Sequence, residues 1–141
     1  VLEKPDLEID CHHTVEDTGI VLGKAIGEAL GDKAGIARFG SFYIPMDEAL
    51  SFAAVDISGR PFLVYDNVHK NEMIGNYETD MTEEFFRAVA FNAGMTLHLK
   101  SLYGTNDHHR IEAMFKAFAY AMAMAVKKLD TDAPVSTKGV L

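Results

Sequence analysis

Two segments of the chain carry the same pattern, His-His-x-x-Glu, at residues 12–16 and 108–112. On a helix the first histidine and the glutamate lie one turn apart on a shared face, and the second histidine is turned by about 100°. A neutral imidazole and a carboxylate placed in this way are suitable ligands for Mn, Fe, Co, Ni or Zn. A lone His-His pair is more often simply solvated or packed, but recurrence of the whole pattern at equal spacing favours ligation. The six candidate ligands are His12, His13, Glu16, His108, His109 and Glu112.

The similarity extends past the ligands into the residues that follow each motif. His108 comes 96 positions after His12, and at this offset Gly23, Ala25, Ile26 and Ala29 match Ala119, Ala121, Met122 and Ala125. So long a period is not that of a solenoid, and it indicates a duplicated half-domain. Only eleven residues precede the first motif, so we expect further sequence before Val1.

The pattern of hydrophobic residues and turns predicts an α+β fold. We expect a strand ending near Asp10 and a helix over 13–30 that stops at Gly31-Asp32. The later elements are expected as strands over 35–45, 49–56 and 61–67, a helix over 81–92, a strand over 95–103 and a helix over 108–129. The second unit thus reads βββαβα. Residues 1–31 would be the closing strand and helix of a first half-domain, and 32–141 a complete second half-domain with a C-terminal tail.

Composition narrows the class of protein. The 141 residues are 48% hydrophobic and 24% charged, which is typical of an ordered globular chain. A formal net charge of −8 without a basic stripe argues against nucleic acid as a partner. The longest apolar run, 117–126, is too short to span a membrane. The single cysteine, Cys11, excludes an internal disulfide and fits a reducing compartment. Its side chain is expected to be either a small buried one or a redox-sensitive one.

Six ordered segments, spread over essentially the whole chain, resemble the imidazoleglycerol-phosphate dehydratase family of histidine biosynthesis. They are DCHHTVEDTGIVLGKAIGEALG, GIARFGSFYIPMDEAL, DISGRPFLVYD, EEFFRAVAFNAGMTLHL, YGTNDHHRIEAMFKA and STKGVL. The resemblance implies duplicated half-domains, each with a sheet and two helices. It also implies a large octahedral homo-oligomer with pairs of manganese ions, two Mn²⁺ per site, at subunit contacts. The implied reaction is metal-dependent dehydration of D-erythro-imidazole glycerol phosphate to imidazole acetol phosphate, in the cytoplasm or, for a plant protein, in a plastid.

The resemblance also implies roles for particular residues. The six motif residues match manganese ligands, and Glu84 stands where many members have a ligating histidine. A ligand in a Leu-Asp-His-Met segment of the first half has no counterpart in this chain. We hypothesise that the His and Glu of one helix share an ion with the second His of the other helix across a subunit contact. Substrate phosphate would be held by Arg38, Arg60, Ser136 and Lys138. Lys116 would contact the substrate, and Glu112 or Glu16 would move the proton.

Other interpretations of these residues stay open. Arg38 and Arg60 have the ordinary alternative of solvated surface charges, and 136–139 that of a frayed tail. Asp47 and Glu48 occupy a predicted turn, where a turn-forming role is favoured over a site role. His98 alternates on a strand and is more readily a structural histidine than a ligand, and His69 is expected at the surface.

Two alternative functions also stay open. The chain could be a catalytically incomplete fragment of this enzyme that binds metal and takes part in assembly. It could also be a dinuclear metallohydrolase that uses the same ligands to activate water.

Overall fold

The structure is a computed structural model that describes residues 12–131, 133, 135 and 136. Its three helices are α1 (His12–Leu30), α2 (Met81–Ala93) and α3 (Asp107–Ala125). The strands are β1 (Phe39–Met46), β2 (Ala49–Asp56), β3 (Phe62–Asp66), β4 (Met73–Ile74), β5 (Tyr77–Glu78) and β6 (Thr96–Tyr103). The strand expected to end near Asp10 lies outside the described residues. None of the described helices is both long enough and apolar enough to cross a bilayer.

Four strands form one sheet in the order β1-β2-β6-β3. Its first three strands pair antiparallel, and β3 pairs parallel to β6 because α2 carries the chain back to the start of the sheet. The predicted α+β class and the βββαβα order are confirmed. The small β4–β5 hairpin between β3 and α2 was not predicted.

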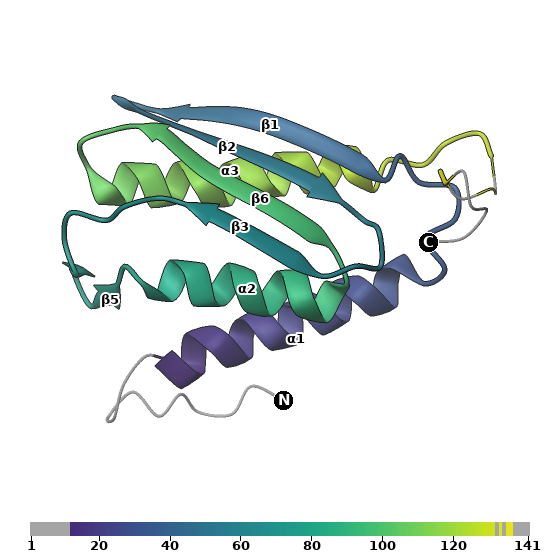
Figure 1. The fold of residues 1–141 in the computed structure, drawn as a ribbon, viewed down its shortest axis with the longest axis horizontal. Helices are drawn as coiled ribbons and strands as arrows, with labels where there is room; N and C mark the ends of the chain where they lie inside the picture. Colours follow the sequence, from purple (N-terminus) through teal and green to yellow (C-terminus); the bar gives the residue numbers. More distant parts are fainter. Residues whose placement is uncertain (1–11, 132, 134, 137–141) are drawn as a thin grey trace.

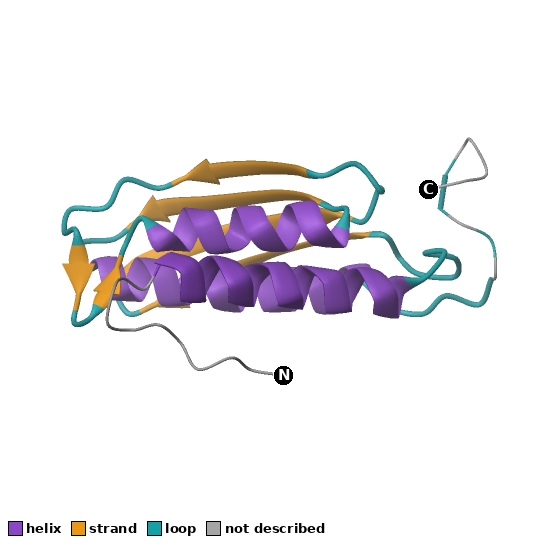
Figure 2. Ribbon diagram, turned by 90° about the horizontal axis from the view of Figure 1, so that it is seen from below, coloured by secondary structure: helices purple, strands orange, loops and turns teal. Residues whose placement is uncertain are grey.

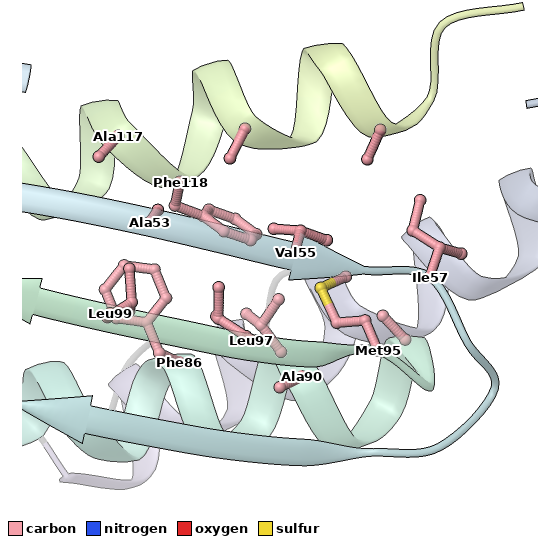
Figure 3. Close-up of a cluster of buried hydrophobic side chains, with 14 of the residues drawn as sticks. Ala53, Val55, Ile57, Phe86, Ala90, Met95, Leu97, Leu99, Ala117 and Phe118 are labelled. Carbon is pink, nitrogen blue, oxygen red and sulfur yellow. The ribbon is translucent and has the colours of Figure 1, made fainter. Parts of the chain in front are cut away.

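The core lies between this sheet and the helices α2 and α3, which cover one of its faces (Figures 1 and 2). Alternate residues of β2 and β6 point into it, among them Val55, Leu97 and Leu99. Phe86 of α2 and Phe118 of α3 meet these side chains from the helix layer (Figure 3), their rings 5.4 Å apart. Both helices are therefore fixed against the same sheet.

Two element boundaries differ from the prediction for one reason. The strand expected from Gly35 begins at Phe39, and the helix expected to reach Leu129 ends at Ala125. Residues 35–38 pair instead with 125–129, through hydrogen bonds such as Leu129 N to the Gly35 carbonyl at 2.9 Å. This tertiary pairing ends the helix after Ala125, although the lysines and the leucine that follow have good helix propensity.

Helix α1 packs beside α2 (Figure 1). A stripe of glycines on α1 faces α2 in this contact. Gly19 and Gly23 are the buried residues of α1. A Cβ on Gly23 would stand 2.7 Å from the Val89 carbonyl oxygen, so only glycine permits this approach. The contact fixes the start of α1 relative to the start of α2.

All three helices begin at the same end of the molecule, where the β1–β2 turn also lies (Figure 1). We call this the helix-start end. Both His-His-x-x-Glu motifs belong to first helical turns, at 12–16 and 108–112. The fold therefore gathers them at one end of the chain.

The glycine stripe yields a prediction about stability. Replacement of Gly23 by alanine gains about 1 kcal/mol of helix propensity but forces α1 away from α2. We expect a net loss of about 1–3 kcal/mol in the free energy of unfolding, measured by urea denaturation. Gly27→Ala is the matched control, because its nearest contact is 3.3 Å and should cost far less. Equal stability of the two variants would contradict the close-packing account.

Candidate active site

The first motif presents one His–Glu pair on the first turn of α1. His12 Nε2 lies 3.8 Å from Glu16 Oε2, and both side chains are a little over two-fifths exposed. His13 is exposed, with its ring 6.1 Å from that of His12 and turned 77° to it. The helical spacing predicted from sequence is therefore observed, with the two imidazoles directed differently.

The second motif repeats this geometry on α3 and adds a lysine. His108 Nε2 lies 3.1 Å from Glu112 Oε2, and Lys116 Nζ is 2.7 Å from Glu112 Oε1. The hydrogen bond from Lys116 and the neighbouring His108 hold the pKa of Glu112 below its ordinary value. Glu112 is thus a carboxylate at neutral pH, the form that a ligand or a base requires.

The second histidine of this motif contacts the β1–β2 turn. His109 Nδ1 lies 2.8 Å from Glu48 Oε2, and its Nε2 is 3.7 Å from Asp47 Oδ2. The hydrogen bond with Glu48 raises the pKa of His109, and the same contact lowers that of Glu48. Asp47 and Glu48 do form the predicted turn, yet the turn also reaches a candidate ligand.

The start of α3 is held by three residues that the sequence did not single out. The Asn106 side chain caps the helix by accepting from the backbone N–H groups of His108 and His109. Asp107 is buried and accepts from the backbone N–H groups of Lys70 and Asn71, both at 2.9 Å. Its neighbour one turn on, Arg110, donates to Ser101 Oγ and the Val68 carbonyl. The Asn106-Asp107 pair immediately before the second motif could have predicted this N-cap from the sequence.

Glu84 and His12 line the same hollow, of about 540 Å³, at the helix-start end. Its wall includes Tyr65 and His69, whose Nε2 lies 3.0 Å from the Tyr65 hydroxyl. Burial raises the pKa of Tyr65 to about 12 and lowers that of His69. His69, which was expected at the surface, is half-buried in this wall, because the loop after β3 places its ring beside that of Tyr65. His98 is exposed on the outer face of the sheet.

Arg38 and Arg60, two of the four residues expected to hold phosphate, meet at the other end of the sheet, which we call the arginine end. Arg38 donates from Nε and Nη2 to the two carboxylate oxygens of Asp56, at 2.7 and 3.2 Å, and from Nη1 to the Val135 carbonyl. The hydrogen bonds with Asp56 raise the pKa of Arg38. Arg60 approaches the same carboxylate at 3.9 Å and is 70% exposed. Ser136 follows Val135 in the chain, and Lys138 lies outside the described residues.

The two clusters lie at opposite ends of β1. Arg38 immediately precedes this eight-residue strand, and Asp47 and Glu48 immediately follow it. At the rise of a β-strand, the nine steps from Arg38 to Asp47 cover about 30 Å. One small molecule cannot touch both ends of the same copy.

The donor sets suit a transition-metal ion, since paired imidazole nitrogens and carboxylate oxygens bind Mn, Fe or Zn. In each motif the first histidine and the glutamate lie on the same face of their own helix. In the described part of the chain, no three His, Cys, Asp or Glu side chains are grouped so that they could hold one ion.

The family model described as imidazoleglycerol-phosphate dehydratase matches residues 1–122. The imidazoleglycerol-phosphate dehydratase of Acetivibrio thermocellus is 62% identical over an alignment that covers 100% of this chain and 73% of that protein. The corresponding protein of Clostridium kluyveri is 54% identical with the same coverage.

Two solved structures of dehydratases resemble this one. The Staphylococcus aureus enzyme superposes with a TM-score of 0.81 at 47% identity, covering 83% of this chain and 69% of that one. The Pyrococcus furiosus enzyme, solved in complex with (S)-C348, gives 0.82 at 38% identity, covering 92% and 71%.

Fold and sequence together define a dehydratase, that is, a hydro-lyase. The chain belongs to the imidazoleglycerol-phosphate dehydratase family of histidine biosynthesis.

The buried Asp107 gives a prediction about stability and pH. Burial raises its pKa, but the hydrogen bonds from Asn71 and Lys70 and the charge of Arg110 outweigh burial and leave the pKa below its ordinary value. A lowered pKa means stabilisation that is complete above about pH 4 and is lost as pH falls through the folded-state pKa. We expect Asp107→Asn to cost about 2–4 kcal/mol at neutral pH, with a smaller difference in acid, by urea denaturation.

The control for Asp107→Asn is Asp66→Asn, which removes an exposed carboxylate paired with Lys100. This change should cost less than about 1 kcal/mol. Similar losses for the two variants, or a loss for Asp107→Asn that does not shrink in acid, would contradict the structural role of Asp107.

Proposed function

We propose that the chain dehydrates D-erythro-imidazole glycerol phosphate to imidazole acetol phosphate, with two Mn²⁺ ions per site, as a homo-oligomer. The observation that carries this proposal is the placement of the residues: imidazole–carboxylate pairs at one end of the chain and an arginine pair at the other. Such ends suit a substrate with an imidazole ring at one terminus and a phosphate at the other.

The ring end of the substrate would be held through the ions at the helix-start end. Each ion would take a His–Glu pair from one motif and the second histidine of the other motif, with Glu84 beside His12 as a further ligand. When bound, the ions act as Lewis acids that draw electron density from the imidazole ring and so make the neighbouring C–H more acidic. Glu112 or Glu16 would accept that proton and return one to the departing hydroxyl. Lys116 supports this role of Glu112, since its hydrogen bond keeps the carboxylate ionised.

The phosphate would be held at the arginine end. Arg60 offers an exposed guanidinium, and Arg38 lies beside it, already oriented by Asp56. Guanidinium groups bind a phosphate dianion through paired, charge-assisted hydrogen bonds. Ser136 and Lys138 would close over the phosphate from the C-terminal segment.

The length of β1 supports the proposal that copies of the chain associate. Because about 30 Å separates the two ends within one copy, the arginine end of one copy would meet the helix-start end of another. The outer face of the sheet supports such contacts, since it exposes apolar and aromatic side chains that include Phe39, Tyr43, Phe62 and Leu102. We propose that these contacts build the octahedral particle, in the cytoplasm, without nucleic acid or membrane as partners.

The test is a dehydration assay combined with a measurement of particle size. Purified protein, stripped of metal by a strong chelator, should lose activity and dissociate, because shared ligation links metal binding to assembly. Resupplied Mn²⁺ should restore a large particle and the formation of imidazole acetol phosphate. A particle that keeps its size after verified metal loss would contradict shared sites. Release of a hydrolysis product instead of imidazole acetol phosphate would favour the metallohydrolase.

A further inference from the structure

Glu48 bridges the β1–β2 turn and the start of α3 with both of its carboxylate oxygens. Oε1 accepts from the backbone N–H groups of Thr105 and Asn106, at 2.9 and 2.8 Å, and from the Thr105 hydroxyl at 3.2 Å. Oε2 lies 2.8 Å from His109 Nδ1. Oε1 thus accepts from three donors, and Oε2 is directed at His109 Nδ1.

The backbone beneath His109 is held as firmly as the carboxylate. Asn106, whose N–H donates to Glu48, also accepts from the N–H groups of His108 and His109, at 2.9 and 3.4 Å. The ring of His109 is only 23% exposed, compared with 59% for His108. The position of the His109 ring relative to Glu48 is thus set by the fold.

A carboxylate can only accept a hydrogen bond, so the proton of the neutral ring must be on Nδ1. The lone pair of the ring is then on Nε2. An outer carboxylate that fixes the tautomer of a ligating histidine in this way recurs in metal sites.

We propose that Glu48 is the positioning residue that holds His109 with its proton on Nδ1 and thereby makes Nε2 the metal-ligating atom. This inference rests on the proposed function, in which His109 binds manganese. Glu48 itself neither ligates the ion nor carries the proton of the reaction.

The isosteric change Glu48→Gln replaces one of the two acceptor oxygens of the carboxylate with an NH₂ donor. If the amide oxygen keeps the two backbone N–H groups, the amide NH₂ faces His109 Nδ1 and requires an acceptor there. The ring proton then moves to Nε2, which removes the lone pair that would bind the ion. If the amide turns over instead, Thr105 and Asn106 lose their acceptor.

The experiment compares wild-type protein with Glu48→Gln in metal-free and metal-loaded form. In the metal-free protein at alkaline pH, ¹⁵N chemical shifts of labelled histidine should place the His109 proton on Nδ1 in wild type and on Nε2 in the variant. Competition with a chelator, followed by the electron paramagnetic resonance of free Mn²⁺, should show affinity lowered about 10- to 100-fold. Glu28→Gln removes the same charge at an exposed position of α1 and should change neither quantity.

A second comparison separates positioning from a merely structural role. In a His109→Ala background, Glu48→Gln should change the Mn²⁺ affinity no further, because no ring is left to orient. An undiminished effect in that background, wild-type affinity in the single variant, or a wild-type proton on Nε2 would each overturn the proposal. If the wild-type protein itself binds no Mn²⁺, the proposed function fails and takes this role with it. Normal Mn²⁺ binding and turnover in Glu48→Gln, with binding lost in His109→Ala, overturns the role of Glu48 alone.

Discussion

The length of β1 sets the distance between the two groups of candidate site residues, and the proposed site depends on that distance. Eight residues of extended strand hold the arginine end and the helix-start end about 30 Å apart, with no flexible element between them. The sheet that fixes this distance is itself fixed by the core it shares with α2 and α3 (Figure 3). In the proposed function, a site that uses both ends is therefore formed between copies, which makes assembly part of the proposed catalysis.

At each end, packing and hydrogen bonds hold the candidate site residues in fixed positions. At the helix-start end, the glycine stripe of α1 sets where His12 stands beside Glu84, and Asp107 anchors α3 to the loop after β3. At the arginine end, Asp56 holds Arg38 in the orientation in which the proposed function has it bind phosphate. Groups oriented in advance lose little conformational entropy when a ligand binds.

The parts of the site that are local in sequence could be predicted, and those that depend on strand register could not. The His–Glu pairs follow from the i, i+4 spacing of one helical turn. The contact between Glu48 and His109 joins residues 61 apart, and that between Arg38 and Asp56 joins residues 18 apart. Neither contact has a local signal. The boundary errors have the same origin, because the pairing of 35–38 with 125–129 is tertiary. The division into half-domains stays a prediction.

Complementation between two variants that each lack one pair of histidines would show whether the ions are shared between copies. One variant would carry His12→Ala and His13→Ala, the other His108→Ala and His109→Ala, and the two would be co-expressed with different tags and purified as mixed particles. If ions are shared between copies, each variant alone binds no Mn²⁺ tightly. The mixture should then recover about a quarter of the wild-type Mn²⁺ content, the statistical share of contacts that join two intact motifs. No recovery of bound Mn²⁺ in verified mixed particles would contradict the account, because it would mean that each copy completes its own sites.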